Sequence, residues 1–210
     1  TLDTIARASA ITSAGNVTLG NACNVKWSPA ASSFRYKLKF TLGNWSYTTG
    51  AIHPNTTAAY TYTGYAIPLD VANQLPKATT GTMTVTLYTY SNSGATTQVG
   101  SASSKTFTVT VPTSAAPAPM MALTAESNLP SSISGLFVQG RSKIKASLSA
   151  TFKYGATANY YDFTVLGKTY GSGHGYTSDY IATSGTVNVT GHAVDSRGYE
   201  GYCYGSIYVI

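Results

Sequence analysis

Charge, cysteine and long apolar runs are all scarce in this chain. Charged residues make up 10% of the 210 residues, with 13 Lys and Arg against 7 Asp and Glu. No apolar run approaches the roughly 20 residues that a membrane-spanning helix needs, so we expect no membrane insertion. The chain starts at Thr1 without an initiator Met or a basic-then-apolar leader. We therefore see no signal peptide and expect a fragment or a processed piece of a longer protein.

The two cysteines, Cys23 and Cys203, are expected to be reduced and buried rather than disulfide-bonded. Cys23 shares strand parity with Trp27, and Cys203 shares it with Val209, so each has the pattern of a small apolar core residue. They also fall in different halves of the chain. The cysteines therefore do not indicate a cellular compartment.

No arrangement of residues predicts an active site. His192 and Cys203 suggest a thiol catalyst, but a catalytic thiol needs an exposed, electropositive setting, and Cys203 has core parity between aromatic neighbours. His53, His174 and His192 are too scattered for a zinc site, and no pair of carboxylates has a spacing typical of acid–base catalysis. The Gly-rich stretch at 171–176 lacks the Lys-Ser/Thr of a phosphate loop and is interpreted as a turn. We expect a protein that is not an enzyme and holds no cofactor or metal.

The positive charge is uneven along the chain. Residues 1–116 hold seven Lys and Arg against Asp3 and Asp70, whereas the remainder holds six against five. Such an excess favours phosphate-rich partners for the first half. The cations never cluster densely, however, and no recognition helix is apparent, so we predict no nucleic-acid binding.

An abundance of Thr, Ser, Gly and Tyr favours pleated sheet over helix. In the first half, apolar and polar residues alternate with the period of half-buried strands in FRYKLKF (34–40), TMTVTLYTY (82–90) and KTFTVTV (105–111). The stretch between the last two contains Asn92 and Gly94, which predict a hairpin turn. Only PLDVANQLP (68–76) has room for a short helical turn.

The second half repeats this plan. Its strand-like segments are MMALTAES, KIKASLSATF, NYYDFTVLG, GTVNVTGHAV and GYCYGSIYVI. Between the halves, PTSAAPAP (112–119) has no hydrophobic period and is typical of a short semi-rigid linker. We predict an all-β protein with two tandem immunoglobulin-like antiparallel β-sandwiches, at 1–111 and 120–210, joined by this linker. A fibronectin III variant or a polycystic-kidney-disease-type domain would give the same pattern.

The loop DSRGYEG lies between the last two predicted strands. Asp195 is placed to accept hydrogen bonds from backbone N–H groups of the turn, Gly198 to adopt positive φ, and Arg197 to face water or a nearby acid. A well-made hairpin loop is the main interpretation. The alternative is a ligand-contacting loop, because such loops carry the binding residues of many sandwiches.

Two rows of tyrosines are predicted on outer sheet faces. Tyr202, Tyr204 and Tyr208 share one parity on the last strand, and Tyr88 and Tyr90 do the same in the first half. Amphipathic rings in a row bind sugars or another protein at little entropic cost. The main interpretation is nevertheless that Tyr is present simply as a good strand former, and the binding role is the alternative.

Several motifs together resemble a known family. They are TLDTIARASAI, YTGYAIPLDVANQLP, GTMTVTLYTYS, LFVQGRSKIKASLSATFKYGATANYYDF and SGTVNVTGHAVDSRGYEG. The chain resembles, over almost its whole length, the repeated Ig-like modules of minor structural proteins from tailed phages of Gram-positive and gut bacteria. The resemblance implies a virion component at the tail tip, in a fibre or on another exposed part, in contact with the host envelope. It supplies no catalytic residues.

We therefore expect a non-enzymatic virion protein that acts as a spacer and a host-surface adhesion module. Its expected partners are other virion proteins, further copies of itself joined through unpaired edge strands, and bacterial surface glycans. The alternative is a carbohydrate-binding or adhesin module of a bacterial surface protein, attached to an enzyme outside this sequence.

Overall fold

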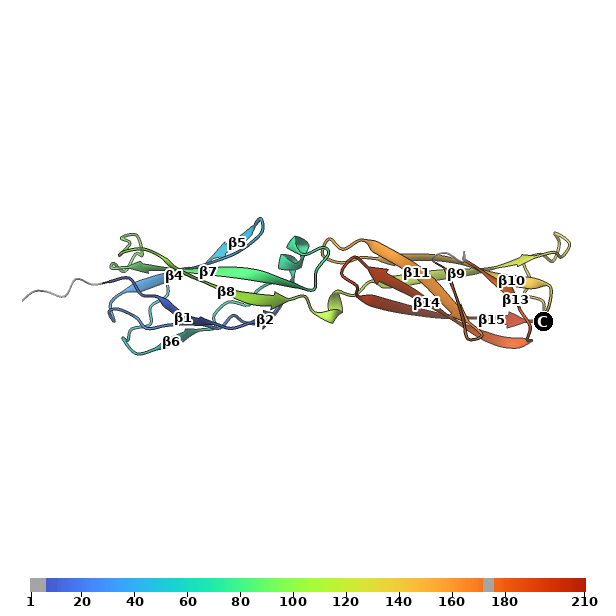
Figure 1. Cartoon of the computed structure of the whole chain (residues 1–210), viewed down its shortest axis with the longest axis horizontal. Coiled ribbons are helices and arrows are strands. Elements are labelled where there is room, and N and C mark those ends of the chain that lie inside the picture. Colours follow the sequence, from blue (N-terminus) through green and yellow to red (C-terminus); the bar gives the residue numbers. More distant parts are fainter. Residues whose placement is uncertain (1–6, 172–175) are drawn as a thin grey trace, which may run out of the picture. The chain divides into compact units, whose positions relative to one another are not determined.

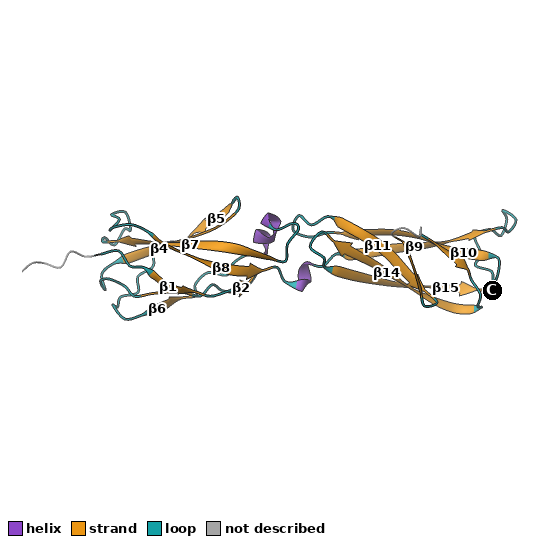
Figure 2. Ribbon diagram, viewed as in Figure 1, coloured by secondary structure: helices purple, strands orange, loops and turns teal. Residues whose placement is uncertain are grey.

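The computed structural model describes residues 7–171 and 176–210, which form an all-β protein (Figures 1 and 2). The chain divides into two compact units, Thr1–Pro112 and Thr113–Ile210. Most of the Gly-rich stretch predicted as a turn, with His174, lies outside the described residues, as do the first six residues of the opening motif. Among the described residues, no helix is long and apolar enough to span a membrane.

Two sheets enclose the core of the first unit. One has the strand order β1-β3-β6 and the other has the order β2-β8-β7-β4-β5, in which only β2 and β8 pair in parallel. The 3₁₀ helix η1 (Leu69–Gln74) occupies the segment predicted to hold a helical turn. The strands are β1 (Ile11–Ala14), β2 (Val17–Thr18), β3 (Val25–Trp27), β4 (Arg35–Leu42), β5 (Trp45–Thr48), β6 (Tyr60–Tyr62), β7 (Thr80–Tyr90) and β8 (Ser103–Thr110).

Strict alternation along β4 fixes which side chains enter this core. Tyr36, Leu38 and Phe40 are fully buried, whereas the residues between them are half-buried on the outer face. Trp27 of β3, in the opposite sheet, is also fully buried, and its ring lies 5.3 Å from that of Tyr36. The predicted period of two is confirmed, because apolar burial selects one face of each strand.

The second unit also has two sheets. Their strand orders are β13-β10-β9 and β12-β11-β14-β15, and all pairings are antiparallel. In Figure 1, β11, β14 and β15 form one layer with β9 and β10 behind it. The elements are η2 (Thr113–Ala115), β9 (Ala118–Ser127), β10 (Ser142–Thr151), β11 (Ala158–Val165), β12 (Lys168–Gly171), β13 (Thr177–Tyr180), β14 (Gly185–Asp195) and β15 (Glu200–Val209).

Side chains from both sheets make the second core. Ile144 of β10 and Ile181, which follows β13, pack with Phe163 of β11, Val189 of β14 and Val209 of β15. Phe163 and Ile144 are fully buried. Burial of aliphatic and aromatic groups of this size is the main stabilising contribution to such a fold.

The segment predicted as a linker, 112–119, has regular structure over much of its length. Residues Thr113–Ala115 form the 3₁₀ turn η2, in which Ala115 is fully buried. Ala118 and Pro119 already belong to β9 and face Thr151 and Ala150 of β10. The predicted linker segment was too long, because small residues without a hydrophobic period can still be ordered by pairing with a neighbouring strand.

Glycines allow β9 to approach β15 closely. A Cβ atom at Gly201 would lie 1.9 Å from the carbonyl oxygen of Pro117, a distance that no side chain tolerates. Further along β15, a Cβ atom at Gly205 would lie 3.3 Å from Met121. The start of the last strand therefore requires glycine for packing rather than for backbone conformation.

Replacement of Gly201 by Ala should destabilise the protein, because the backbone of Pro117 or of β15 must move. Overpacking of this kind costs about 1–3 kcal/mol of unfolding free energy, which urea denaturation followed by circular dichroism would measure. The matched control is Gly135→Ala, where nothing lies within 4 Å of the added methyl group. Equal stability of the two variants would contradict the close approach.

Candidate functional site

Three tyrosines form an exposed row on β15. Tyr202, Tyr204 and Tyr208 have 51%, 79% and 70% of their surface exposed. The alternate residues Ile207 and Val209 are buried in the core, which forces the tyrosine rings to the outer face. The parity predicted from the sequence is confirmed, and we call these three residues the tyrosine row.

Polar side chains of β14 line the tyrosine row. The register places Thr186 opposite Tyr208, Asn188 opposite Ser206 and Thr190 opposite Tyr204. Side chains opposite one another on adjacent strands are close enough to contact one ligand together. The face thus offers aromatic rings beside hydroxyl and amide groups, which is the usual composition of a surface that binds sugars or proteins.

His192 forms a polar cluster at one end of this face. Its Nδ1 lies 3.1 Å from both carboxylate oxygens of Asp162 on β11, and its ring stacks on Tyr202 at 4.7 Å. The Tyr202 hydroxyl donates to Glu200 Oε2 at 3.0 Å, and this hydrogen bond is the main cause of the raised pKa of Tyr202. Sequence reasoning missed the cluster, because only the cross-strand register brings these residues together.

His192 and Cys203 do not form a catalytic pair. A Cβ atom at Gly191, directly opposite Cys203, would lie 2.6 Å from Cys203 Sγ and 3.1 Å from Leu148 of the other sheet. The thiol therefore faces the interior, whereas the His192 side chain is on the outer face. Burial raises the pKa of Cys203, which opposes formation of a thiolate.

The two cysteines differ in burial. Cys23 is buried as predicted, but Cys203 is only half-buried, and both are free. Cys203 was expected to be buried because its parity matches that of Val209. The parity of Cys203 therefore predicted its side of the strand but overestimated its burial.

Asp195, the last residue of β14, is fully buried where the chain enters the turn to β15. Its Oδ1 accepts hydrogen bonds from the backbone N–H groups of Arg197 and Tyr199, each at 2.9 Å. Gly198 has φ 87°, as the predicted turn requires. Asp195 was a candidate binding residue, but its carboxylate is used within the turn and is not accessible to a ligand.

Arg197 was predicted to face water or to pair with a nearby acid, and the first of these alternatives was wrong. Its side chain is buried, with 7% of the residue exposed. The guanidinium donates to the carbonyl oxygens of Lys153, at 2.9 Å, and Tyr154. Desolvation lowers its pKa. Arg197 thus fastens the loop between β10 and β11 to the last hairpin, and it is a structural residue rather than an exposed binding residue.

Tyr88 and Tyr90 lie on the outer face of β7, as predicted, but both are half-buried. The register places Tyr90 opposite Arg35 and Tyr88 opposite Lys37. The ammonium group of Lys37 lies 5.4 Å from the centre of the Tyr90 ring. This arrangement of rings among cations has no counterpart on the tyrosine row.

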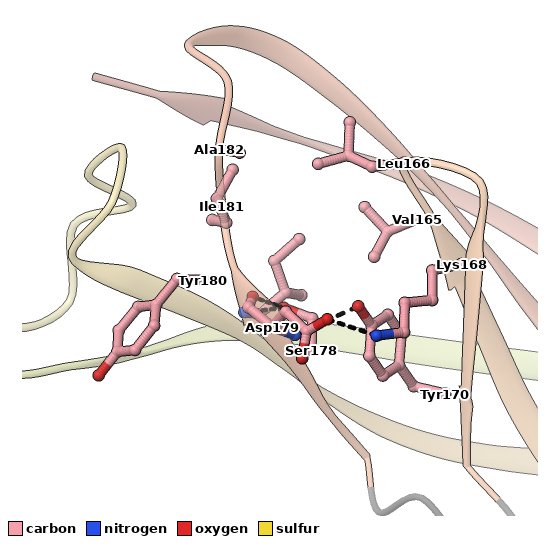
Figure 3. A pocket seen from close by; sticks show the side chains of 10 residues that line it. Val165, Leu166, Lys168, Tyr170, Ser178, Asp179, Tyr180, Ile181 and Ala182 are labelled. Atoms are coloured by element: carbon pink, nitrogen blue, oxygen red, sulfur yellow. Dashed lines mark hydrogen bonds and ion pairs between the residues drawn. The ribbon is translucent and has the colours of Figure 1, made fainter.

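A small pocket opens between β12 and β13 of the second unit (Figure 3). Its volume is about 180 Å³, and its lining includes Ile144, Val165 and Ile181. Pockets for small molecules usually measure about 300–1,000 Å³. The volume is therefore too small for this pocket to be a ligand site of ordinary size.

An ion pair closes one side of this pocket. Lys168 Nζ lies 2.5 Å from Asp179 Oδ2, which raises the pKa of Lys168 and lowers that of Asp179. The pair therefore stabilises the fold at pH values between the ordinary pKa of Asp and the ordinary pKa of Lys. This stabilisation is lost as the pH falls through the lowered pKa of Asp179 or rises through the raised pKa of Lys168. Both side chains are well exposed, so the contribution is small.

The described residues contain no group of three or more His, Cys, Asp or Glu side chains placed to hold a metal ion.

A family model described as "Siphovirus protein of unknown function (DUF859)" matches residues 1–204. The chain belongs to this siphovirus family. It is therefore a phage protein, which the resemblance in sequence had implied. A search of curated proteins finds no match to this siphovirus protein.

Several solved structures are distantly similar to this siphovirus protein. The fibronectin(III)-like modules of Clostridium thermocellum CbhA share 16% identity, with 96% of this chain and 94% of that chain covered and a TM-score of 0.33. A tetra-tandem repeat from the extending region of a large adhesion protein shares 14%, with 96% and 48% covered and a TM-score of 0.37. Domains 3–6 of protocadherin gamma B2 share 13%, with 97% and 49% covered and a TM-score of 0.35. The chain spans about half the length of the last two.

Removal of the Arg197 side chain should destabilise the siphovirus protein. Two charge-assisted hydrogen bonds are lost in Arg197→Ala, and we expect the unfolding free energy to fall by about 2–3 kcal/mol. Amide exchange should also become faster at residues 153–157. Arg141→Ala, which removes an exposed arginine, is the control and should change the free energy by less than about 0.5 kcal/mol. An unchanged stability in Arg197→Ala would show that the guanidinium does not hold the two loops.

Proposed function

We propose that this phage protein is a non-enzymatic structural component of the virion that acts as a spacer and as a host-surface adhesion module. In this proposal the two units are tandem Ig-like β-sandwiches, located in a tail, a fibre or another exposed part of the particle. Family membership supports the phage context. The spacer and adhesion roles rest on the strand order and on the composition of the outer faces.

The repeated strand order supports the Ig-like assignment. The order β5-β4-β7-β8 in the first unit corresponds to β12-β11-β14-β15 in the second, and each sheet faces a three-stranded partner sheet. Sandwiches of this type occur widely in extracellular proteins, where rigid strands present loops and faces to partners. Two such units in one chain suit a spacer.

The tyrosine row is the observation that carries the adhesion proposal. Tyr204 and Tyr208 expose 79% and 70% of their surface although they lie on a rigid strand with a buried opposite side. A ring held in this way loses little conformational entropy on binding. Many copies on one particle would turn weak contacts into strong attachment.

Two further features support the remaining parts of the proposal. His192 and Cys203 face opposite sides of their sheet, which supports a non-enzymatic role. Within the described part of the second unit, β15 is the last strand of its sheet and pairs only with β14. Its free edge offers a route to assembly with another copy or another virion protein.

Immunogold electron microscopy of intact virions tests the virion role. Antibodies raised against this chain should label purified particles at a defined position on the tail, a fibre or another exposed part. Virions from a phage that lacks this chain provide the control for specificity. Failure to label or detect the chain in purified particles, although it is present in infected cells, would contradict the role in the virion.

Truncation of two rings of the tyrosine row should weaken binding to bacterial surface glycans. On a glycan array, we expect Tyr204→Ala/Tyr208→Ala to reduce binding by roughly tenfold, since each ring contributes about 0.5–1.5 kcal/mol. The matched control is Tyr180→Ala, which removes a ring that is 50% exposed on the other sheet. Equal binding by the double variant and the wild type would contradict a role for the tyrosine row.

A further inference from the structure

The first unit carries positive charge that its own side chains do not neutralise. Its described residues hold seven Lys and Arg, and their one acid is Asp70, in η1. Arg35, Lys37 and Lys39 all lie on the outer face of β4, and no ion pair is found for any of them within the described part of the chain. An unpaired column of cations attracts anions over a distance of about 8–10 Å at moderate salt.

The spacing of this column is fixed by the core. Tyr36, Leu38 and Phe40 alternate with the three cations and are fully buried, so β4 cannot slip or rotate. Successive cations on one strand face are about 6.6–6.8 Å apart. β4 is also an inner strand of its sheet, between β7 and β5. The cations therefore form a pre-arranged row along β4.

Rings and hydroxyl groups flank the row on β7 and β8. Tyr90, Tyr88 and Thr86 face Arg35, Lys37 and Lys39 in register. The hydroxyl of Thr86 lies 2.8 Å from that of Ser104, on the next strand. Sugar rings pack on aromatic faces, and their hydroxyl groups bond to such side chains. We call Arg35, Lys37, Lys39, Tyr88 and Tyr90 the basic face.

A polar hollow lies at the Arg35 end of the basic face. It measures about 420 Å³ and is lined by Ser32, Ser33, Arg35, His53, Asn55, Ser91 and Ser93. Arg35 Nη1 donates to the carbonyl oxygen of Ser33 at 2.6 Å, which holds the guanidinium at this position. A guanidinium has five N–H donors, so others remain for an anionic group. Among the residues that the structure describes, no carboxylate lines the hollow.

We propose that the basic face binds an anionic polysaccharide, with its negative groups along Arg35, Lys37 and Lys39 and its sugar rings against Tyr88 and Tyr90. This inference rests on the proposed adhesion function and names the chemical class of its ligand. The proposed ligand is any polymer of sugars or polyols that carries phosphate or carboxylate groups. Duplex nucleic acid fits less well, because the three cations lie on an inner strand of a sheet and not on a helix or two-stranded ribbon of the size that enters a groove.

A charge-matched pair of variants tests the inference. The row variant loses the three positive charges of β4 and is Arg35→Gln/Lys37→Gln/Lys39→Gln. The control variant loses three positive charges from other surfaces and is Lys26→Gln/Lys77→Gln/Lys145→Gln. Titration calorimetry with poly(glycerol phosphate) and with polygalacturonate distinguishes phosphate from carboxylate ligands. Neutral dextran and duplex DNA are titrated as well, because they represent an uncharged polysaccharide and a nucleic acid.

We expect the wild type to bind at least one of the two charged polymers, and more weakly as salt rises from about 50 to about 200 mM. The row variant should lose at least about tenfold in affinity, whereas the control variant should stay within about twofold. Circular dichroism should show that both remain folded, because only outward-facing side chains change.

Three results would overturn the inference. They are an equal loss in both variants, equal or tighter binding of neutral dextran, and preferential binding of duplex DNA through the row. Absence of binding to both charged polymers would overturn it as well. None of these results decides the adhesion proposal, because that proposal is tested separately through Tyr204 and Tyr208 and through labelling of virions.

Discussion

Every surface of this protein depends on the alternation of side chains along its strands. Where apolar residues enter the core, the residues between them must face outward at a fixed spacing. Burial of Tyr36, Leu38 and Phe40 therefore positions the basic face. Burial of Ile207 and Val209 likewise positions the tyrosine row. Stability and display of binding groups are consequences of the same packing.

The same alternation explains what could be predicted from the sequence. Strands with a long apolar period, such as β4, β7 and β14, were located from pattern alone, and so was the side on which the tyrosine row lies. The short strands β12 (Lys168–Gly171) and β13 (Thr177–Tyr180) were not predicted, because four residues carry too little periodicity. They are ordered instead by pairing with β11 and β10.

Contacts between distant segments were beyond sequence reasoning. The burial of Arg197 was not predicted, because it donates to carbonyl groups more than 40 residues away, which leave no signal in the local pattern. The His192–Asp162 cluster depends on register between β14 and β11. Asp195 accepts hydrogen bonds within the turn as predicted, yet its complete burial was not predicted from the local pattern. Local chemistry was predictable, but accessibility was not.

The two units use their charges differently. In the second unit, Lys168 is paired with Asp179, His192 contacts Asp162, and Arg197 is buried against carbonyl oxygens. These charges act within the fold, and the exposed tyrosine row has mainly hydroxyl and amide neighbours. In the first unit, the cations of the basic face have no acidic partner among the described residues.

Because of this difference, the proposed adhesion combines two kinds of contact that act over different distances. Coulombic attraction to the basic face acts over about one Debye length and is weakened by salt. Ring contacts at the tyrosine row act only at van der Waals distance and are little affected by salt. A particle with both would be drawn to an anionic surface first and would then be selective through short-range fit. If each contact is weak alone, as proposed, release of single copies would stay fast while the whole particle would remain attached.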